Sequence, residues 1–162
     1  MKKIGEIFLG VYTYLSDPGY DTSGVCPHSL ISTIPGDYCV YITRSKSKDP
    51  MIKGRISNII AIHKDYIKRM EGRLPMDSHE DLNCGVDSGT CGIFNAVYYD
   101  DYHFDDGIDD DWYDRMVCQD CPEFRITDEY GAFSSSGLGD GWYPIYAEYE
   151  NNKAYAVRIK FL

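Results

Sequence analysis

Three short stretches combine an aspartate with glycine and hydroxyl residues, the residue types that can hold a polar ligand or a metal ion. They are SDPGY (16–20), VDSG (86–89) and SSSGLGDG (134–141). Acids in such stretches usually bond turn amides and hold loops in place, and we favour that role here. If the three turns converged, they could instead form a polar pocket or an oxygen-only site for Ca²⁺ or Mg²⁺. The residues of this candidate pocket are Asp17, Asp87, Ser88, Ser135, Ser136 and Asp140.

The glycine-rich stretch at 134–141 lacks the features of a phosphate loop or a nucleophile. It has no Lys of the GxxxxGK[ST] type, and a strand rather than a helix is expected after it, so no helix N-terminus would hold a phosphate. A Ser-His-Asp arrangement would need His63 together with Ser88 or Ser135 and Asp87 or Asp140, but no GxSxG elbow supports it. The sequence therefore favours a strand–turn–strand connection and a protein that is not an enzyme.

Six cysteines raise the question of zinc or disulfides. Cys118 and Cys121 form a single CxxC, and the nearest second pair is Cys26 with His28, which would complete a Cys3His zinc site. We favour packed free thiols, because the opening MKKIGEIFLGVYTYL is broken by Glu6 and does not predict a signal peptide. No stretch approaches the ~20 apolar residues of a membrane span. We expect a cytoplasmic protein without a cofactor.

The negative charge of the chain is concentrated in one segment. Residues 1–73 hold 11 Lys and Arg against 7 Asp and Glu, whereas residues 74–162 hold 5 against 19. DDYHFDDGIDDDWYD (100–114) alone carries eight aspartates, and Gly107 does not fit the glycine position of an EF-hand loop. Such a run is ordinarily a solvated loop, but interleaved aromatic residues are typical of protein-binding surfaces. The candidate partner-binding residues are Asp100, Asp101, Tyr102, Phe104, Asp105, Asp106, Asp109, Asp110, Asp111 and Trp112.

The elements that must position these residues are mostly strands, because aromatic and β-branched residues dominate the ordered stretches. Alternation predicts strands at 6–15, 37–44, about 55–63, two within 83–99, and at about 130–135, 142–149 and 154–161. A short helical turn should follow His63 and stop at Gly72, and Asp109 can cap a helix over 110–118. We expect loops at 20–35 and 73–82. The sum is one mainly β (α+β) domain, an antiparallel sheet or sandwich with one or two short helices.

Three motifs together resemble a known group. SDPGY (16–20), GVDSGTCGIF (85–94) and SSSGLGDGWYPIY (134–146) are similar to patterns of the uncharacterised bacterial and phage-borne domain-of-unknown-function group numbered forty-two forty-one. Gly19, Asn95 and the long aspartate run depart from the pattern. The resemblance implies a β-rich single domain from a bacterium, phage or mobile element, and it implies no reaction.

These features predict a non-enzymatic binding protein. Its acidic, aromatic segment would engage a protein partner with a basic surface, as an inhibitor or immunity-type protein does when it occupies a nucleic-acid-binding site. We expect no direct contact with nucleic acid, since phosphates repel acids, and no membrane. The alternative is a small-ligand or divalent-metal-binding domain, or a hydrolase, built on the three Asp/Gly turns.

Overall fold

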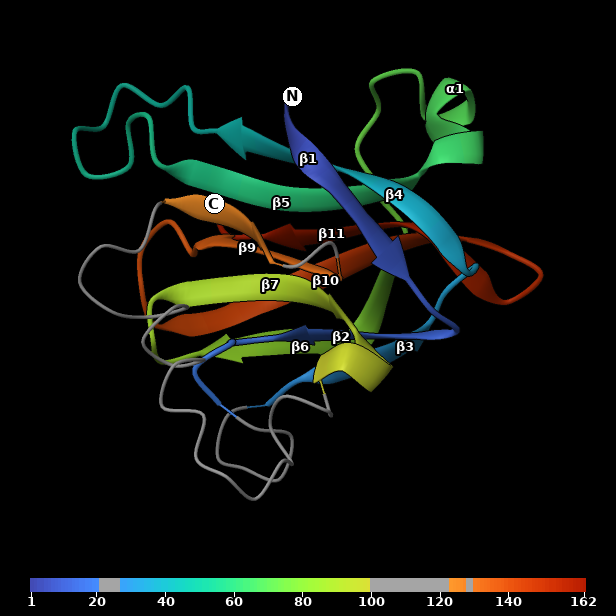
Figure 1. The fold of residues 1–162 in the computed structure, drawn as a ribbon. Helices are drawn as coiled ribbons and strands as arrows, with labels where there is room; N and C mark the ends of the chain where they lie inside the picture. The colour runs from blue at the N-terminus through green and yellow to red at the C-terminus, as the bar shows by residue number, and fades with distance from the viewer. Residues whose placement is uncertain (21–26, 100–122, 128–129) are drawn as a thin grey trace.

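Two antiparallel sheets pack against each other (Figure 1). The computed structural model describes residues 1–20, 27–99, 123–127 and 130–162. The larger sheet has the order β1 (Lys2–Leu9), β4 (Gly36–Arg44), β5 (Ile56–His63), β11 (Lys153–Lys160), β10 (Gly141–Glu150), β6 (Ser78–Val86). The smaller sheet has the order β3 (Ser29–Ser32), β2 (Tyr12–Ser16), β7 (Thr90–Asn95), β9 (Gly131–Ser135), β8 (Phe124–Thr127). The predicted fold class, mainly β with short helices, is confirmed.

The main hydrophobic core lies between the sheets, because alternate side chains of each strand point inward. From β4 the larger sheet contributes Val40 and Ile42, and the smaller sheet contributes Leu15 and Ile93. This alternation is the pattern from which the strands at 37–44 and 154–161 were predicted.

The strand β5 is buried on both faces. Its Ile59 and Ala61 side chains face the other sheet, whereas Ile60 and Ile62 pack on the outer side. Two short helices, η1 (Lys64–Tyr66) and α1 (Ile67–Met70), cover that outer side and end at Glu71 in a left-handed conformation. Burial on both faces explains why this strand carries four apolar residues in a row, 59–62, instead of a strict alternation. No helix among the described residues is long and apolar enough to cross a membrane.

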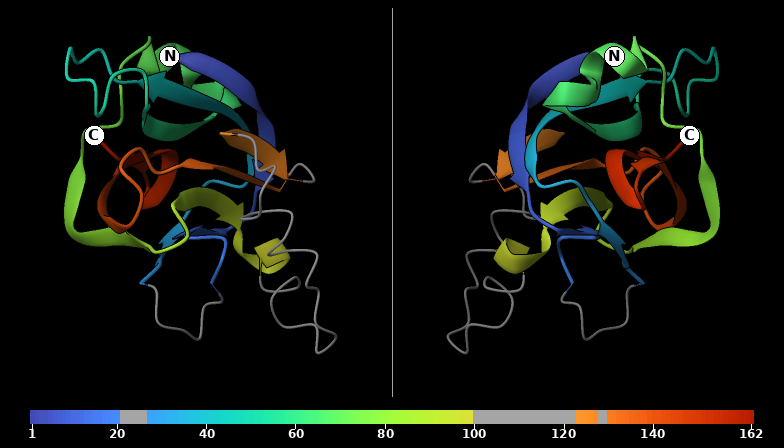
Figure 2. Two further views of the ribbon diagram at one scale, coloured as in Figure 1. Left: turned by 90° about the vertical axis from the view of Figure 1, so that its left-hand side faces the viewer. Right: turned by 90° about the vertical axis from the view of Figure 1, so that its right-hand side faces the viewer.

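The stretch 6–15, expected as one strand, is two strands in different sheets. The chain crosses from one sheet to the other at Gly10 and Val11, whose carbonyl oxygens accept bonds from Thr33 Oγ1 (2.7 Å) and Thr33 N–H (2.8 Å). The alternation of apolar residues continues through this crossing, so the sequence pattern contains no break. At the opposite end of the molecule from α1, β2 and β3 form a hairpin (Figure 2).

Two expected loops contain strands. The 20–35 stretch includes β3, and the 73–82 stretch includes the first half of β6. Both are edge strands, which lack a neighbour on one side and therefore tolerate polar residues and weak alternation. The helix expected over 110–118 with Asp109 as its cap lies outside the described residues. Among the described cysteines, Cys39, Cys84 and Cys91 are buried and free, as expected.

The edges of the two sheets approach each other. On one side the amide of Gly85 in β6 donates to the carbonyl oxygen of Pro27, just before β3 (2.8 Å). On the other side Ile126 of β8 occupies the space beside Gly5 of β1, where a Cβ would lie only 2.5 Å from Ile126 Cγ1. Glycines at both contacts let the chains come close.

Candidate functional site

A single buried carboxylate, Asp17, organises the corner where the predicted turns meet. Its Oδ2 atom accepts hydrogen bonds from the amides of Asp87 (2.8 Å) and Ser88 (2.7 Å). Its Oδ1 atom accepts from the amide of Gly19 (2.8 Å) and from Ser88 Oγ (2.5 Å). All of these donors belong to turns, so the Asp17 carboxylate joins the turn after β2 to the turn between β6 and β7.

The third turn joins the same corner through Ser136. The Ser136 amide and hydroxyl both donate to the carbonyl oxygen of Gly89 (3.0 and 3.1 Å), and the hydroxyl lies 2.6 Å from the carbonyl oxygen of Gly139. Ser135, in contrast, donates its amide to the carbonyl oxygen of Glu123. Asp140 is exposed. The structure thus brings Asp17, Ser88 and Ser136 together in a connected network, with Asp140 at its solvent side.

A buried tyrosine fixes the turn after β2 from beneath. The Tyr99 hydroxyl lies 2.7 Å from the carbonyl oxygen of Tyr20 and 3.1 Å from that of Asp17. Burial raises the pKa of Tyr99 well above its usual value, so the phenol remains a donor even in alkaline solution. The hydrogen bond from the Tyr99 hydroxyl to the main-chain carbonyl of Tyr20 therefore fixes the position of Tyr20.

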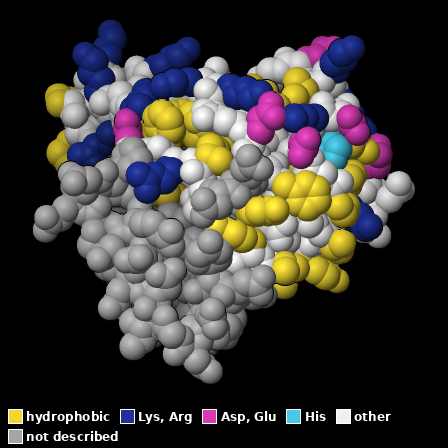
Figure 3. Space-filling model, in the orientation of Figure 1, with side chains coloured by type: hydrophobic (Ala, Val, Ile, Leu, Met, Phe, Trp, Pro, Cys, Tyr) yellow, Lys and Arg dark blue, Asp and Glu magenta, His cyan; other side chains and the backbone are white. Residues whose placement is uncertain are grey.

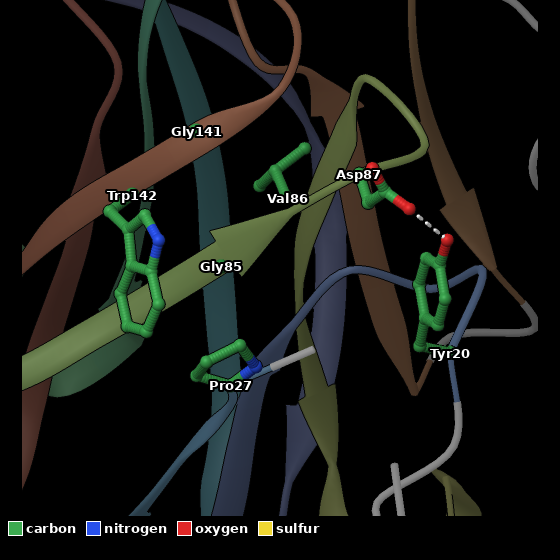
Figure 4. A pocket seen from close by; sticks show the side chains of 7 residues that line it. All are labelled: Tyr20, Pro27, Gly85, Val86, Asp87, Gly141 and Trp142. Atoms are coloured by element: carbon green, nitrogen blue, oxygen red, sulfur yellow. Dashed lines mark hydrogen bonds between the residues drawn. The ribbon is translucent and has the colours of Figure 1, made fainter. Parts of the chain in front are cut away.

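Beside this network lies a pocket of about 280 Å³ (Figure 4). Its lining residues are Tyr20, Pro27, Gly85, Val86, Asp87, Gly141 and Trp142. The register of β6 against β10 builds it, because Trp142 pairs with Gly85 and Gly141 pairs with Val86. Gly85 has no side chain, and a Cβ there would lie only 2.6 Å from Pro27 Cδ, so the glycine allows the Pro27 ring to pack directly against β6.

The pocket has one apolar end and one acidic end. Trp142 is 68% exposed, since its neighbour Tyr143 points inward to the core. Across the pocket, the exposed Asp87 carboxylate accepts a hydrogen bond from the Tyr20 hydroxyl through Oδ2 (Figure 4). No Lys or Arg of the described residues forms an ion pair with Asp87.

The remaining predicted site residues fall in two groups. The acidic segment 100–114 lies outside the described residues, as do Cys26, Cys118 and Cys121, so the partner-binding and zinc hypotheses stay predictions. Within the described residues His28 packs edge-on against Tyr14 (5.4 Å between ring centres), and no group of three metal-ligating side chains occurs. His63 lies between Tyr38 and Tyr66 and accepts from the Asp65 amide, so its contacts are not those of a catalytic base for Ser88.

Sequence reasoning found Asp87 but missed Tyr20, Pro27 and Trp142. One signal was available for Trp142: in the strand predicted at 142–149, Tyr143, Ile145 and Ala147 share a face, which places Trp142 on the other. The pocket itself depends on the register of β6, a strand whose first half was not predicted.

The three motifs that carry the family resemblance meet at this corner. They supply Asp17 and Tyr20, the turn at Asp87, and the Ser136 turn with Trp142. Their convergence gives the motifs a shared structural role, and the family assignment stays a prediction. No protein-family model matches the chain, and no curated protein or solved structure was found to be similar to it.

Proposed function

We propose that the protein is a non-enzymatic binding module that engages a protein partner with a basic surface. The distribution of charge is the observation that carries this proposal. The chain has a net charge of -10, and the single segment 100–114 holds eight Asp and no Lys or Arg, or -8. The rest of the chain is therefore at only -2. Acidic residues so concentrated steer a basic partner to one part of a molecule.

Basic side chains gather along one edge of the described part of the molecule, where Figure 3 shows a row of Lys and Arg. The β4–β5 connection contributes three exposed lysines, Lys46, Lys48 and Lys53. The strand β1 adds Lys3, which is paired with Glu6 at 2.6 Å. None of these cations lines the pocket at Asp87.

Three polar side chains of the turns, Asp17, Ser88 and Ser136, are engaged in structural bonds. The Asp17 carboxylate accepts four hydrogen bonds, and the Ser88 hydroxyl lies 2.5 Å from Asp17 and 2.7 Å from Thr90 Oγ1. The Ser136 hydroxyl lies near two main-chain carbonyls. This favours the binding function over the alternative of a hydrolase built on the same turns.

In its most specific form, the proposal is that the protein acts as an inhibitor or immunity-type protein. The acidic residues at 100–111 would occupy the surface with which a bacterial or phage partner otherwise binds nucleic acid. Aromatic residues within the segment, Tyr102, Phe104 and Trp112, would supply the apolar contacts that such interfaces need.

The test compares two variants that carry the same loss of charge. In the acidic-segment variant Asp105, Asp106, Asp109, Asp110 and Asp111 are replaced by Asn. In the control variant five exposed acids from the part of the chain that the structure describes are replaced by their amides: Asp49, Asp65, Glu71, Asp77 and Asp140. Both should keep the thermal stability of the wild type within a few degrees.

Each protein is immobilised and exposed to the heparin-retained fraction of a bacterial lysate, and every captured protein is purified and tested with labelled DNA. We expect a partner that the wild type and the control variant bind, that the acidic-segment variant does not, and that loses its DNA when the wild type is added. Equal capture by both variants, or capture without displacement of DNA, would contradict the proposal.

A further inference from the structure

The pocket at Asp87 combines an exposed aromatic ring with a carboxylate. Trp142 offers an exposed indole face, and tryptophan is the best partner for a cation over an aromatic ring. At the other end the Asp87 carboxylate is held by the Tyr20 hydroxyl through Oδ2, while Oδ1 has no hydrogen-bond partner within the described structure. A ligand that fills the pocket must therefore be apolar beside Trp142 and must donate beside Asp87.

The electrostatic surroundings favour a cation at the acidic end. The buried carboxylate of Asp17 lies directly behind the Asp87 amide, and exposed Asp140 comes just before Gly141 of the lining. No lining residue among those that the structure describes is a Lys, Arg or His. Covering Asp87 with a ligand that lacks hydrogen-bond donors would cost desolvation free energy without compensation, whereas a cation with N–H donors forms the stronger, charge-assisted bonds that offset that cost.

The size of the pocket favours a single side chain over a larger ligand. Its volume of about 280 Å³ lies just below the range of about 300–1,000 Å³ that is usual for small-molecule sites. Pro27 lies between the two ends (Figure 4), so the middle of the pocket offers apolar contacts. An arginine side chain has the matching order of groups: an apolar stem and a planar, charged head with five donors.

We propose that this pocket binds an arginine side chain of the partner protein, with the guanidinium group at Asp87 and the stem against Pro27 and Trp142. This inference rests on the proposed function in one respect: the arginine would belong to the protein partner proposed there. Arginine is preferred to lysine because a guanidinium group can stack on a ring and donate to a carboxylate at once, which a compact ammonium group does less well.

The probe is a capped pentapeptide with a single arginine between Gly and Ser residues. Matched peptides carry lysine or citrulline in its place, citrulline being the neutral analogue of arginine, and a neutral disaccharide is titrated in parallel. Replacing Trp112 by Phe leaves Trp142 as the only tryptophan, so its indole N–H gives one assignable NMR signal. We follow that signal and the Asp87 amide as each probe is added.

We expect saturable shifts of both signals with the arginine peptide, weaker ones with lysine and none with citrulline or the disaccharide. Asp87→Asn and Trp142→Ala should each weaken binding at least about fivefold, because each removes one of the two ends, while Asp140→Asn should change it less than about twofold. Asp87→Asn keeps the backbone amide that binds Asp17, and its NMR spectrum verifies that it folds.

Four results would overturn the proposal: no saturable shift, equal binding of citrulline, binding of the disaccharide instead, or equal losses in Asp87→Asn and Asp140→Asn. The last would show that general negative charge attracts the peptide. Repeating the titration in the acidic-segment variant separates the two proposals, since arginine binding at the pocket should persist there even if that variant shows that the acidic segment binds no partner.

Discussion

Replacing Asp17 by alanine should destabilise the whole domain, because this carboxylate joins two turns that belong to different strands. The substitution leaves the amides of Asp87 and Ser88 without their acceptor. Hydrogen bonds to a charged group contribute about 1.5–3 kcal/mol each. The Gly19 amide and the Ser88 hydroxyl lose the same acceptor, but both residues are partly exposed, so water can accept some of these hydrogen bonds instead. Taking the lower value for each of the two amides gives a loss of about 3 kcal/mol. This is a large part of the free energy of unfolding, which is usually about 5–15 kcal/mol.

Urea unfolding followed by tyrosine and tryptophan fluorescence measures this loss. The midpoint should fall while the slope stays constant, since the amount of surface exposed on unfolding is unchanged. Asp49→Ala is the matched control: its carboxylate accepts from the amide of Met51 (2.9 Å) in an exposed turn, so it should cost less than about 1 kcal/mol. A loss of less than about 1 kcal/mol in Asp17→Ala as well would refute the role given to this residue.

Three further predictions test other parts of the fold. Two lysines lower the pKa of Glu6 to about 2 from its ordinary 4.5. The contribution of Glu6 to stability is therefore present above pH 4.5 and is lost as the pH falls toward 2. Glu6→Gln should be less stable than the wild type at pH 7 in low salt, and the chemical unfolding curves of the two proteins should converge near pH 2. Gly92→Ala should lower stability by about 1–3 kcal/mol, because its Cβ would lie 2.5 Å from the ring of Phe94; an unchanged melting temperature would contradict this packing. Tyr38→Phe should cost about 1–2 kcal/mol in urea unfolding, since the buried hydroxyl donates to main-chain carbonyls of Ile34 and Ala154, and a neutral result would mean that these bonds do not contribute.

Strands with apolar alternation were predictable from the sequence. Alternation located 37–44 and 154–161, where Val40 and Ile159 face the main core. The pattern at 154–161 also suggested an open face, but β11 is buried on both faces, with Ala156 and Arg158 covered as well. The short β3 and the polar start of β6 escaped prediction, because an edge strand needs little hydrophobic alternation. The break at Gly10 also escaped it, since what ends β1 is Thr33, a residue more than twenty positions away.

The candidate site was also predictable only in part: residue types indicated the turns, but not the pocket beside them. Residue types alone identified Asp17, Asp87 and Ser88 as turn-forming acids and hydroxyls, and the preferred role, pinning of loops, agrees with the four bonds that Asp17 accepts. The pocket was not predictable, because it arises where Trp142 pairs with Gly85. Strand register is set by the packing of whole sheets rather than by local sequence.

The approach of the sheet edges has a consequence for how any partner can attach. Proteins often recruit a peptide by adding it as an extra strand to an open edge, through main-chain hydrogen bonds that read little of its sequence. Here Gly85 of β6 already donates its amide to Pro27, and β8 lies against β1 at Gly5. At these points strand addition is blocked, and so is edge-to-edge aggregation. Recognition there must come from side chains, and its selectivity will therefore depend on which residues the partner presents.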